Sequence, residues 1–184
     1  MSRAHSIVGV SEGRDENDFY ITPAGTIKAI LQAEPMVGSI WEPSCGTGAI
    51  SNELIAHGYD SVISSDLIDR GYGVGGVNFL KTDLSVDNII TNPPFSLAKE
   101  FVHHALKCAS GKVIMLAKIQ FLAGQKRQYL FQEPSFKGIY VCTKRLKMQR
   151  AYEDKSYKNG GMMDFAWYVW DKQTENNLPT IKWL

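Results

Sequence analysis

Short apolar runs of strand character alternate along the chain with segments of helical periodicity, and this order strongly constrains the fold. The expected strands are 37–41, 60–66, 86–91, 111–117, 136–142 and 163–170, and the expected helices are 24–34, 49–58, 95–110 and 120–133. Strands that alternate with helices form a parallel sheet covered by helices on both faces. No helical segment separates the last two runs, so they should pair antiparallel. We therefore predict an α/β fold: a doubly wound, mostly parallel sheet with a terminal antiparallel hairpin.

The chain has the size and composition of one domain. It has 184 residues, of which 44% are hydrophobic, enough for one sizeable core. Residues 1–18 are polar and lack periodicity, so we expect a flexible arm followed by a single domain over 19–184. No stretch of about 18 apolar residues is present, so no membrane segment is expected. Three widely spaced cysteines suggest neither a disulfide framework nor a metal pair, and they favour the reducing cytoplasm.

A glycine-rich turn joins the first strand to the second helix. Its sequence is Glu42-Pro43-Ser44-Cys45-Gly46-Thr47-Gly48. Gly46 and Gly48 allow a tight turn and a close approach of the backbone to a ligand. The turn lacks the third glycine of the dinucleotide fingerprint, and Glu42 would repel a pyrophosphate. A carboxylate at this place suits a cationic ligand instead.

A second acid follows the next strand at a matching offset. Asp66 comes 24 residues after Glu42, close to the roughly 20-residue offset of a carboxylate that accepts both ribose hydroxyls. Alternatively, Glu42 could serve as a charge at a helix N-terminus, and Asp66 as a turn residue. The two acids occur together at the right offset, which favours a nucleoside cofactor over these structural roles.

The sequence Asn92-Pro93-Pro94-Phe95 directly follows the expected strand 86–91. Two prolines fix the backbone and take it out of a strand ladder. We expect the Asn92 oxygen and the Pro93 carbonyl to accept the hydrogens of an exocyclic amine, while a planar base stacks on Phe95. The alternative is a cis-proline turn with a core phenylalanine.

Together these motifs resemble the class I S-adenosylmethionine-dependent methyltransferases, and among them the small phage and prophage DNA adenine methyltransferases. The resemblance covers about residues 17–171. It rests on DFYITP (18–23), EPSCGTGAIS (42–51), SSDLIDRGYG (64–73), NFL (78–80), DNIITNPPF (87–95), QFLAGQKR (120–127) and DFAWYVWDK (164–172). The order of EPSCGTG and the downstream NPPF is the most specific part of this signal.

The resemblance implies S-adenosyl-L-methionine as the cofactor and methyl transfer to the N-6 amine of adenine in DNA. By position, the implied cofactor-binding residues are Phe19, Tyr20, Thr22, Pro23, Glu42, Ser44, Cys45, Gly46, Gly48, Asp66, Leu67, Asn78 and Phe79. The implied catalytic residues are Asn92, Pro93, Pro94 and Phe95. Asn78 stands where the family usually has an acid, so its bond to the adenine of the cofactor would lack charge assistance.

Basic residues concentrate in the second part of the chain. Residues 1–100 have 6 Lys/Arg and 13 Asp/Glu, and residues 101–184 have 14 and 6. Larger relatives carry a target-recognition domain for which this chain has no room. The 20-residue connection 143–162 is basic instead, and we expect Lys144, Arg145, Lys147 and Arg150 to bind nucleic-acid phosphates, of DNA rather than RNA. A solvated loop is the alternative.

Other functions compete with this one. An RNA methyltransferase acting on adenine N-6 or the guanine 2-amine could use the same motif. A protein-glutamine methyltransferase is disfavoured by Phe95, where such sites have tyrosine. A non-catalytic binding protein is disfavoured by the intact Asn92–Phe95. No metal site is expected, because adjacent His103 and His104 cannot point the same way on a helix. Trp167 and Trp170 are expected in the core.

Overall fold

The computed structural model describes residues 19–146, 163–174 and 178–184. The expected arm 1–18 and two of the expected phosphate-binding residues, Lys147 and Arg150, lie outside these ranges. Among the described residues, no helix is long and apolar enough to cross a membrane.

Seven strands form one mixed sheet. They are β1 (Ile40–Glu42), β2 (Val62–Ser64), β3 (Asn88–Thr91), β4 (Lys112–Lys118), β5 (Phe136–Val141), β6 (Phe165–Asp171) and β7 (Thr180–Trp183). Their order across the sheet is β2-β1-β3-β4-β6-β5-β7. The first four are mutually parallel, and β6 runs antiparallel to both of its neighbours. The C-terminal strand β7 pairs in parallel with β5.

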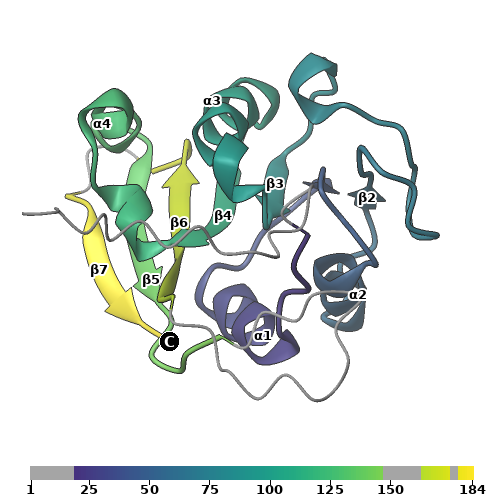
Figure 1. Ribbon diagram of the computed structural model, residues 1–184, viewed down its shortest axis with the longest axis horizontal. Helices are drawn as coiled ribbons and strands as arrows, with labels where there is room; N and C mark the ends of the chain where they lie inside the picture. The colour runs from purple at the N-terminus through teal and green to yellow at the C-terminus, as the bar shows by residue number, and fades with distance from the viewer. Residues whose placement is uncertain (1–18, 147–162, 175–177) are drawn as a thin grey trace, which may run out of the picture.

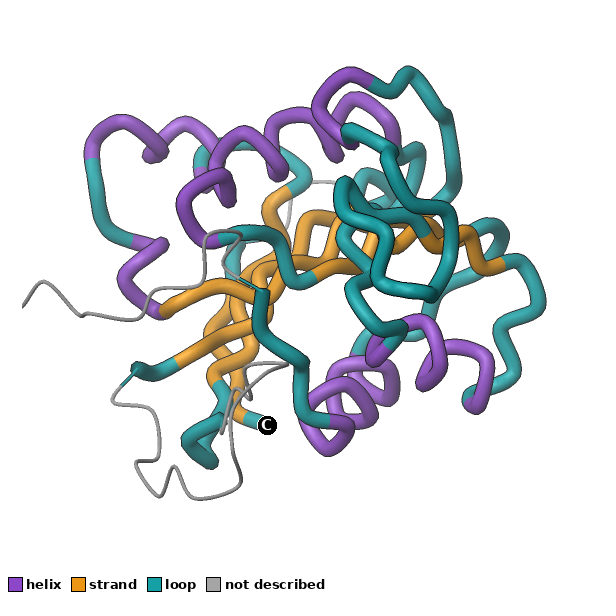
Figure 2. Tube along the Cα trace, turned by 45° about the vertical axis from the view of Figure 1, so that its right-hand side comes forward, coloured by secondary structure: helices purple, strands orange, loops and turns teal. Residues whose placement is uncertain are grey.

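Helices cover both faces of this sheet. The helices are α1 (Ala24–Ala33), α2 (Ala49–Ala56), α3 (Ala98–Cys108) and α4 (Gln128–Phe131), with 3-10 turns η1 (Phe79–Lys81), η2 (Phe95–Leu97), η3 (Ile119–Leu122) and η4 (Gln125–Arg127). In Figure 1, α1 and α2 lie below the strands, whereas α3 and α4 lie above them. The turned view in Figure 2 shows the same three layers, helices on either side of the strands.

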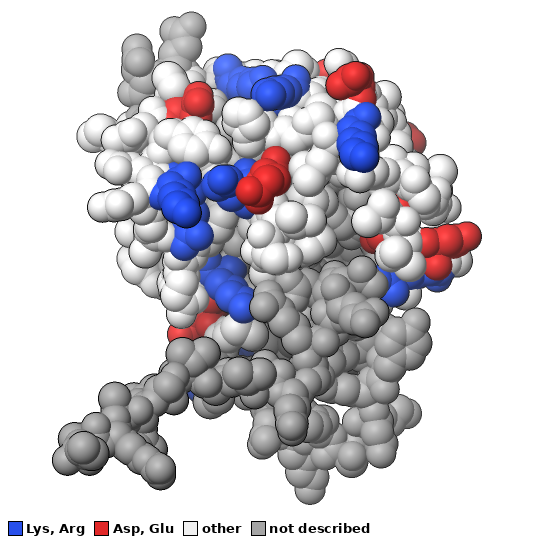
Figure 3. All heavy atoms as spheres, turned by 45° about the horizontal axis from the view of Figure 1, so that its top comes forward, with Lys and Arg blue, Asp and Glu red and all other residues white. Residues whose placement is uncertain are grey.

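The outer surface is charged and mixed in sign. On the face seen in Figure 3, lysine and arginine side chains are interspersed with acidic ones. In the first turn of α3, Lys99 and Glu100 form an exposed ion pair, with 3.4 Å between Nζ and Oε1. An exposed pair of this kind contributes little to stability, so the fold depends on its interior.

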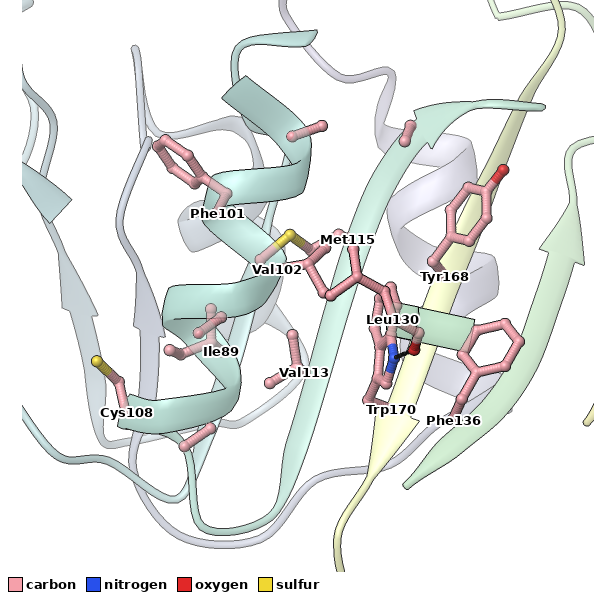
Figure 4. Packing of buried hydrophobic residues seen from close by; sticks show 14 of the residues in the cluster. Ile89, Phe101, Val102, Cys108, Val113, Met115, Leu130, Phe136, Tyr168 and Trp170 are labelled. Carbon is pink, nitrogen blue, oxygen red and sulfur yellow. Dashed lines mark hydrogen bonds between the residues drawn. The ribbon is translucent and has the colours of Figure 1, made fainter. Parts of the chain in front are cut away.

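The core lies on both faces of the central strands because successive residues of a strand point to opposite sides. In β4, Ile114 and Leu116 pack toward α1 and α2, while Val113 and Met115 pack toward α3. Figure 4 shows the α3 side, where Met115 and Trp170 lie close to the helix and α4. Trp170 also donates from Nε1 to the Leu130 carbonyl at 2.8 Å. Both Trp167 and Trp170 are fully buried, as the sequence predicts.

The predicted fold class is confirmed, with refinements. The antiparallel hairpin partners are β5 and β6, but β6 inserts between β4 and β5 instead of extending the edge. The predicted helix 120–133 is wrong: Gly124, with φ at 122°, divides this segment into η3, η4 and the single turn α4. The described peptide bonds are all trans, so the cis-proline reading of Asn92–Pro94 is also wrong.

The strand directions decide where a site can form. The C-terminal ends of β1 to β4 all lie at one edge of the sheet, because these strands are parallel. The end of β5 reaches the same edge, since β5 is antiparallel to β6 and β6 to β4. Ligands of open α/β sheets bind at this edge.

Candidate cofactor and amine site

A cavity of about 240 Å³ opens where β1, β2 and β3 end. Most residues of the predicted cofactor site line it, together with two of the predicted catalytic residues. They are Phe19, Tyr20, Thr22, Glu42, Ser44, Cys45, Asp66, Leu67, Asn78, Phe79, Asn92 and Pro94. Gly46 and Gly48 form the turn beside the cavity but do not line it, nor do Pro93 and Phe95. Pro23 instead lines a neighbouring cavity of about 620 Å³, which Lys144 and Arg145 also line.

The glycine turn has the backbone that its sequence predicts. Gly46 and Gly48 have φ values of 55° and 85°, in the left-handed region. A Cβ on Gly46 would lie 2.3 Å from Cε2 of Phe19, so only glycine lets this ring pack on the turn. Asp66 Oδ2 accepts from the Gly46 N–H at 2.8 Å, and Oδ1 accepts from the Ile68 N–H at 2.9 Å. Asp66 is thus the turn residue of the alternative reading and also a carboxylate facing the cavity.

Glu42 is a buried acid at the bottom of the site. Its Oε2 accepts from the Ser51 backbone N–H at 2.7 Å, in the first turn of α2, and also contacts the Ser51 hydroxyl. Glu42 therefore has the helix-terminal role that its position allows, and it still lines the cavity. Burial raises its pKa to about 8, against the lowering effect of the Ser51 hydrogen bonds, and the charge of Asp66 raises it further.

Cys45 is part of the same turn but is a poor nucleophile. Its side chain is buried, and its Sγ donates to the Tyr72 carbonyl at 3.5 Å. Burial raises the thiol pKa to about 12, helped by the charges of Glu42 and Asp66. The thiolate, which is the reactive form, is therefore suppressed.

The far end of the cavity is apolar. The exposed Leu67 side chain and the buried Phe79 ring lie along it. Phe79 is held edge-on against Trp41 and His104, with ring centroids 5.0 and 4.8 Å away. Asn78 caps η1, since its Oδ1 accepts from the Leu80 N–H at 3.1 Å. Leu67 and Phe79 thus give this part of the cavity an apolar lining with the polar Asn78 beside it, a combination that fits a purine ring.

Residues 19–22 form a strap that touches both parts of the site. The Phe19 ring lies against Gly46 and beneath the Arg70 guanidinium, whose carbon is 4.0 Å from the ring centroid. The Tyr20 ring stacks on Phe95, with centroids 5.6 Å apart and planes at 22°. The strap thereby joins the glycine turn to the Asn92–Phe95 motif.

Asn92 is held by this strap through one end of its amide. Its Nδ2 donates to the Tyr20 carbonyl and to Thr22 Oγ1, each at 3.1 Å. Its Oδ1 is buried and has no hydrogen-bond partner among the described residues. A buried acceptor without a partner is costly in a native structure, so a donor from a ligand or from an ordered water is the expected partner.

The Phe95 ring follows β3 and is half-buried between several side chains. Besides Tyr20, it contacts Phe165 at 5.5 Å between centroids. The Lys118 ammonium, at the end of β4, lies 4.9 Å from the centroid of Phe95. Because Tyr20 stacks on Phe95 and Lys118 lies over the same ring, a planar base that stacks on Phe95 would have to displace one of these two side chains.

Basic side chains follow the ends of β4 and β5 on the same edge. Lys118 is the last residue of β4, and Lys126 and Arg127 follow it. Arg127 donates from Nη2 to the Gln120 carbonyl at 2.8 Å. Lys144 and Arg145 follow β5 and are exposed, with Arg145 Nε 3.7 Å from Asp164 Oδ1. The acidic residues Glu42 and Asp66 lie where β1 and β2 end, whereas these basic residues lie where β4 and β5 end. Acidic and basic side chains are therefore separated along this edge of the sheet.

Arg70 and Lys118 are the site residues that sequence reasoning missed. Arg70 lies inside the SSDLIDRGYG motif, and Lys118 ends the β4 run, next to the Asn92–Phe95 strand. Both residues lie at or shortly after the C-terminal end of a strand, and this position could have indicated that they belong to the site. No group of three His, Cys, Asp or Glu side chains lies close enough to hold a metal in 19–146, 163–174 and 178–184. His104 instead lies 2.9 Å from the Thr82 carbonyl through Nε2.

Comparison with known proteins adds a set of structural relatives. No family model matches the chain, and no curated protein matches it in sequence. A protein of Pyrococcus horikoshii assigned as an RNA methyltransferase is 15% identical with a TM-score of 0.63, covering 83% of this chain and 86% of that one. A dimethyladenosine transferase of Plasmodium falciparum is 15% identical with a TM-score of 0.56, covering 83% and 63%.

A further structural relative is a protein of Vibrio vulnificus assigned as the modification subunit of a type I restriction enzyme. It is 15% identical to this chain, with a TM-score of 0.62. The match covers 85% of this chain but only 45% of the subunit, so this chain spans less than half the length of the subunit. At these identities the likeness concerns the fold. The chain has the Rossmann-like α/β fold of class I methyltransferases, a seven-stranded, mostly parallel sheet with one antiparallel hairpin.

Proposed function

We propose that the cavity binds S-adenosyl-L-methionine. The residues fit this cofactor because carboxylates of Glu42 and Asp66 face a space that also has an apolar slot at Leu67 and Phe79. Ser44 Oγ, like Asn92 Oδ1, is buried without a hydrogen-bond partner among the described residues, and both can bind the polar groups of a ligand. Asp66 would accept the ribose hydroxyls, and Asn78 would meet the adenine amine. Glu42, whose pKa of about 8 keeps it mostly protonated at pH 7 in the free protein, would favour the cationic end by losing its proton when the cofactor binds.

We propose further that the chain is a methyltransferase whose acceptor is an exocyclic amine. When bound, S-adenosylmethionine would supply an electrophilic methyl group on its sulfonium. Asn92 Oδ1 and the Pro93 carbonyl, which lies beyond the β3 ladder ending at Thr91, would accept the two amine hydrogens. The nitrogen lone pair is then freed from conjugation and directed at the methyl group. Positioning and these two acceptors provide the catalysis.

The proposed substrate is the N-6 amine of adenine in DNA. The resemblance of EPSCGTG and NPPF to the phage adenine methyltransferases favours DNA, and the basic residues at the β4–β5 end fit a polyanion. The target adenine would have to leave the duplex, at a cost of a few kcal/mol that stacking on Phe95 and phosphate contacts offset. Among the relatives, one is named for adenosine and another for RNA, so RNA is an alternative outcome of the test.

The unpaired, buried Oδ1 of Asn92 is the observation that carries this proposal. The test is to incubate the protein with labelled S-adenosylmethionine and DNA, RNA or protein, and to identify the methylated product by mass spectrometry. We expect N6-methyladenine in DNA, and a loss of about 10²-fold in turnover for Asn92→Ala with little change in cofactor affinity. Methylation found only on RNA would overturn the DNA assignment, and full activity of Asn92→Ala would overturn the site.

A further inference from the structure

We infer that Thr22 and the Tyr20 carbonyl orient the Asn92 amide so that its oxygen, and not its nitrogen, faces the substrate amine. Thr22 is then a positioning residue that acts through Asn92, beyond the cofactor role that its motif suggests. This inference rests on the proposed function, because it assigns the part of the site that holds the acceptor amine.

The contacts define this orientation on one side of the amide. The Tyr20 carbonyl can only accept, so the amide group 3.1 Å from it must be the NH2. Thr22 Oγ1, also at 3.1 Å from Nδ2, accepts the second hydrogen. Thr22 is only 4% exposed, so water cannot easily replace its hydroxyl. The two donors of Asn92 are thus used, and its acceptor is left over.

The chemistry of the substrate explains why this matters. An exocyclic amine has two hydrogens to donate, so it needs an acceptor, and an amide turned by 180° would present NH2 to NH2. A flipped amide would also place Oδ1 against the Tyr20 carbonyl oxygen. The Tyr20 carbonyl favours the orientation in which Asn92 Nδ2 points toward it. The hydrogen bond from Nδ2 to Thr22 Oγ1 stabilises the same orientation and fixes the plane of the amide.

Thr22→Val tests this positioning role, since valine has nearly the same shape but no hydroxyl. We expect kcat to fall by about 10-fold or more, with a much smaller change in the Kd of S-adenosylmethionine, and Thr22→Ser to restore most of kcat. Thr26→Val is the matched control: Thr26 is also a buried threonine, but its hydroxyl accepts from Trp167 Nε1 at 2.9 Å and the residue does not line the proposed cofactor cavity. It should lose stability but keep kcat.

A second variant, Asn92→Asp, gives a pH dependence of activity that would not arise if the contacts of Asn92 with residues 20 and 22 were purely structural. In Asn92→Asp, an ionised carboxylate would place an oxygen against the Tyr20 carbonyl, whereas the protonated acid can donate to it and still offer its other oxygen to the amine. The activity of Asn92→Asp relative to the parent should therefore rise as the pH is lowered from 8 to 5. A ratio that stays constant over this range would overturn the inference, as would unchanged kcat in Thr22→Val.

The orientation is also measured without turnover, which separates it from the proposed function. In protein labelled with ¹⁵N-asparagine, the Asn92 side-chain NH2 should exchange slowly with water in the parent and in Thr22→Ser, and faster in Thr22→Val. If the parent methylates no DNA, RNA or protein while this pattern holds, the proposed function fails and the orientation stands. If exchange is equally fast in the parent and Thr22→Val, the orientation fails.

Discussion

Asp66 Oδ2 accepts a hydrogen bond from the backbone N–H of Gly46 at 2.8 Å, across the gap between the ends of β2 and β1. The same carboxylate accepts from the Ile68 N–H through Oδ1. Each oxygen has further lone pairs, so these bonds fix the carboxylate in place and leave acceptor capacity for a ligand. One side chain thus shapes the glycine turn and presents the proposed ribose acceptor.

Asp66→Ala should weaken S-adenosylmethionine binding by about 10-fold or more, because it removes a charged acceptor and loosens the turn. Calorimetric titration measures the Kd. Asp69→Ala is the control, since this exposed acid of the same loop accepts from the nearby Gly71 N–H and does not line the cavity. Equal affinities of Asp66→Ala and the parent would contradict the ribose assignment.

Asn78→Asp should tighten cofactor binding. A carboxylate can cap η1 through the Leu80 N–H as the amide does, and it accepts from an adenine amine with charge assistance, which makes such a bond roughly twice as strong. The measurement is the Kd at one salt concentration, with thermal unfolding of the free protein to show that the cap is intact. A weaker Kd at unchanged stability would mean that Asn78 does not meet the adenine.

Glu42 makes stability depend on pH in a definite direction. Its pKa is about 8 in the fold, because burial disfavours the charged form, against 4.5 for the free side chain. Its favourable contribution is therefore complete below pH 4.5 and is lost as the pH rises through about 8, at a slope of up to ~1.4 kcal/mol per pH unit. Glu42→Gln keeps an acceptor for Ser51 and should lack this dependence. Denaturant unfolding of both proteins between pH 5 and 9 measures it, and parallel curves would contradict the buried acid.

The cation of Arg70 should slow the release of the cofactor, because it holds Phe19 over the glycine turn. Arg70→Met keeps the apolar stem but removes the charge, and a contact of this type contributes about 1 kcal/mol, or roughly fivefold in rate. Stopped-flow dissociation of S-adenosylmethionine measures the effect, with Arg70→Lys expected between the two. An unchanged rate in Arg70→Met would show that the strap does not close through this contact.

Nucleic-acid binding should depend steeply on salt through the basic residues after β5. Replacing Lys144, Arg145, Lys147 and Arg150 by Ala should flatten the slope of log K against log salt by about 0.9 for each lost phosphate contact on duplex DNA. The control is Lys107→Gln with Lys172→Gln, two lysines that flank the start of β4 at the opposite edge of the sheet. Cofactor affinity should not change. A slope that the four replacements leave intact would place the phosphate contacts elsewhere.

The strands and the main helices follow from the sequence because their signals are local. The apolar run of β4 and the one-sided pattern of α3 are both complete within a dozen residues, and their buried positions agree with the pattern. The insertion of β6 between β4 and β5 depends on contacts between segments about 50 residues apart, which periodicity does not encode. Likewise, the break at Gly124 is a backbone conformation that competes with helical spacing.

The same distinction applies to the site. The places of Glu42, Asp66 and Asn92 beside one cavity could be predicted because each lies at or just after a strand end, and parallel strands bring their ends together. Their hydrogen bonds could not: nothing local indicates that Thr22 contacts Asn92 across 70 positions, or that Arg70 covers Phe19. These contacts arise from the path of residues 19–22 over the folded sheet.

The place of β6 also has a consequence for synthesis on the ribosome. Until residues 165–171 leave the exit tunnel, β4 lacks its partner on one side and β5 has nothing that joins it to the rest of the sheet. Both strands are rich in buried apolar side chains, so the nascent chain would expose two open sheet edges during translation. This part of the sheet can therefore close only after β6 has left the tunnel, and a nascent chain arrested with β5 outside the tunnel and β6 still inside should aggregate more than one arrested after β6 has emerged.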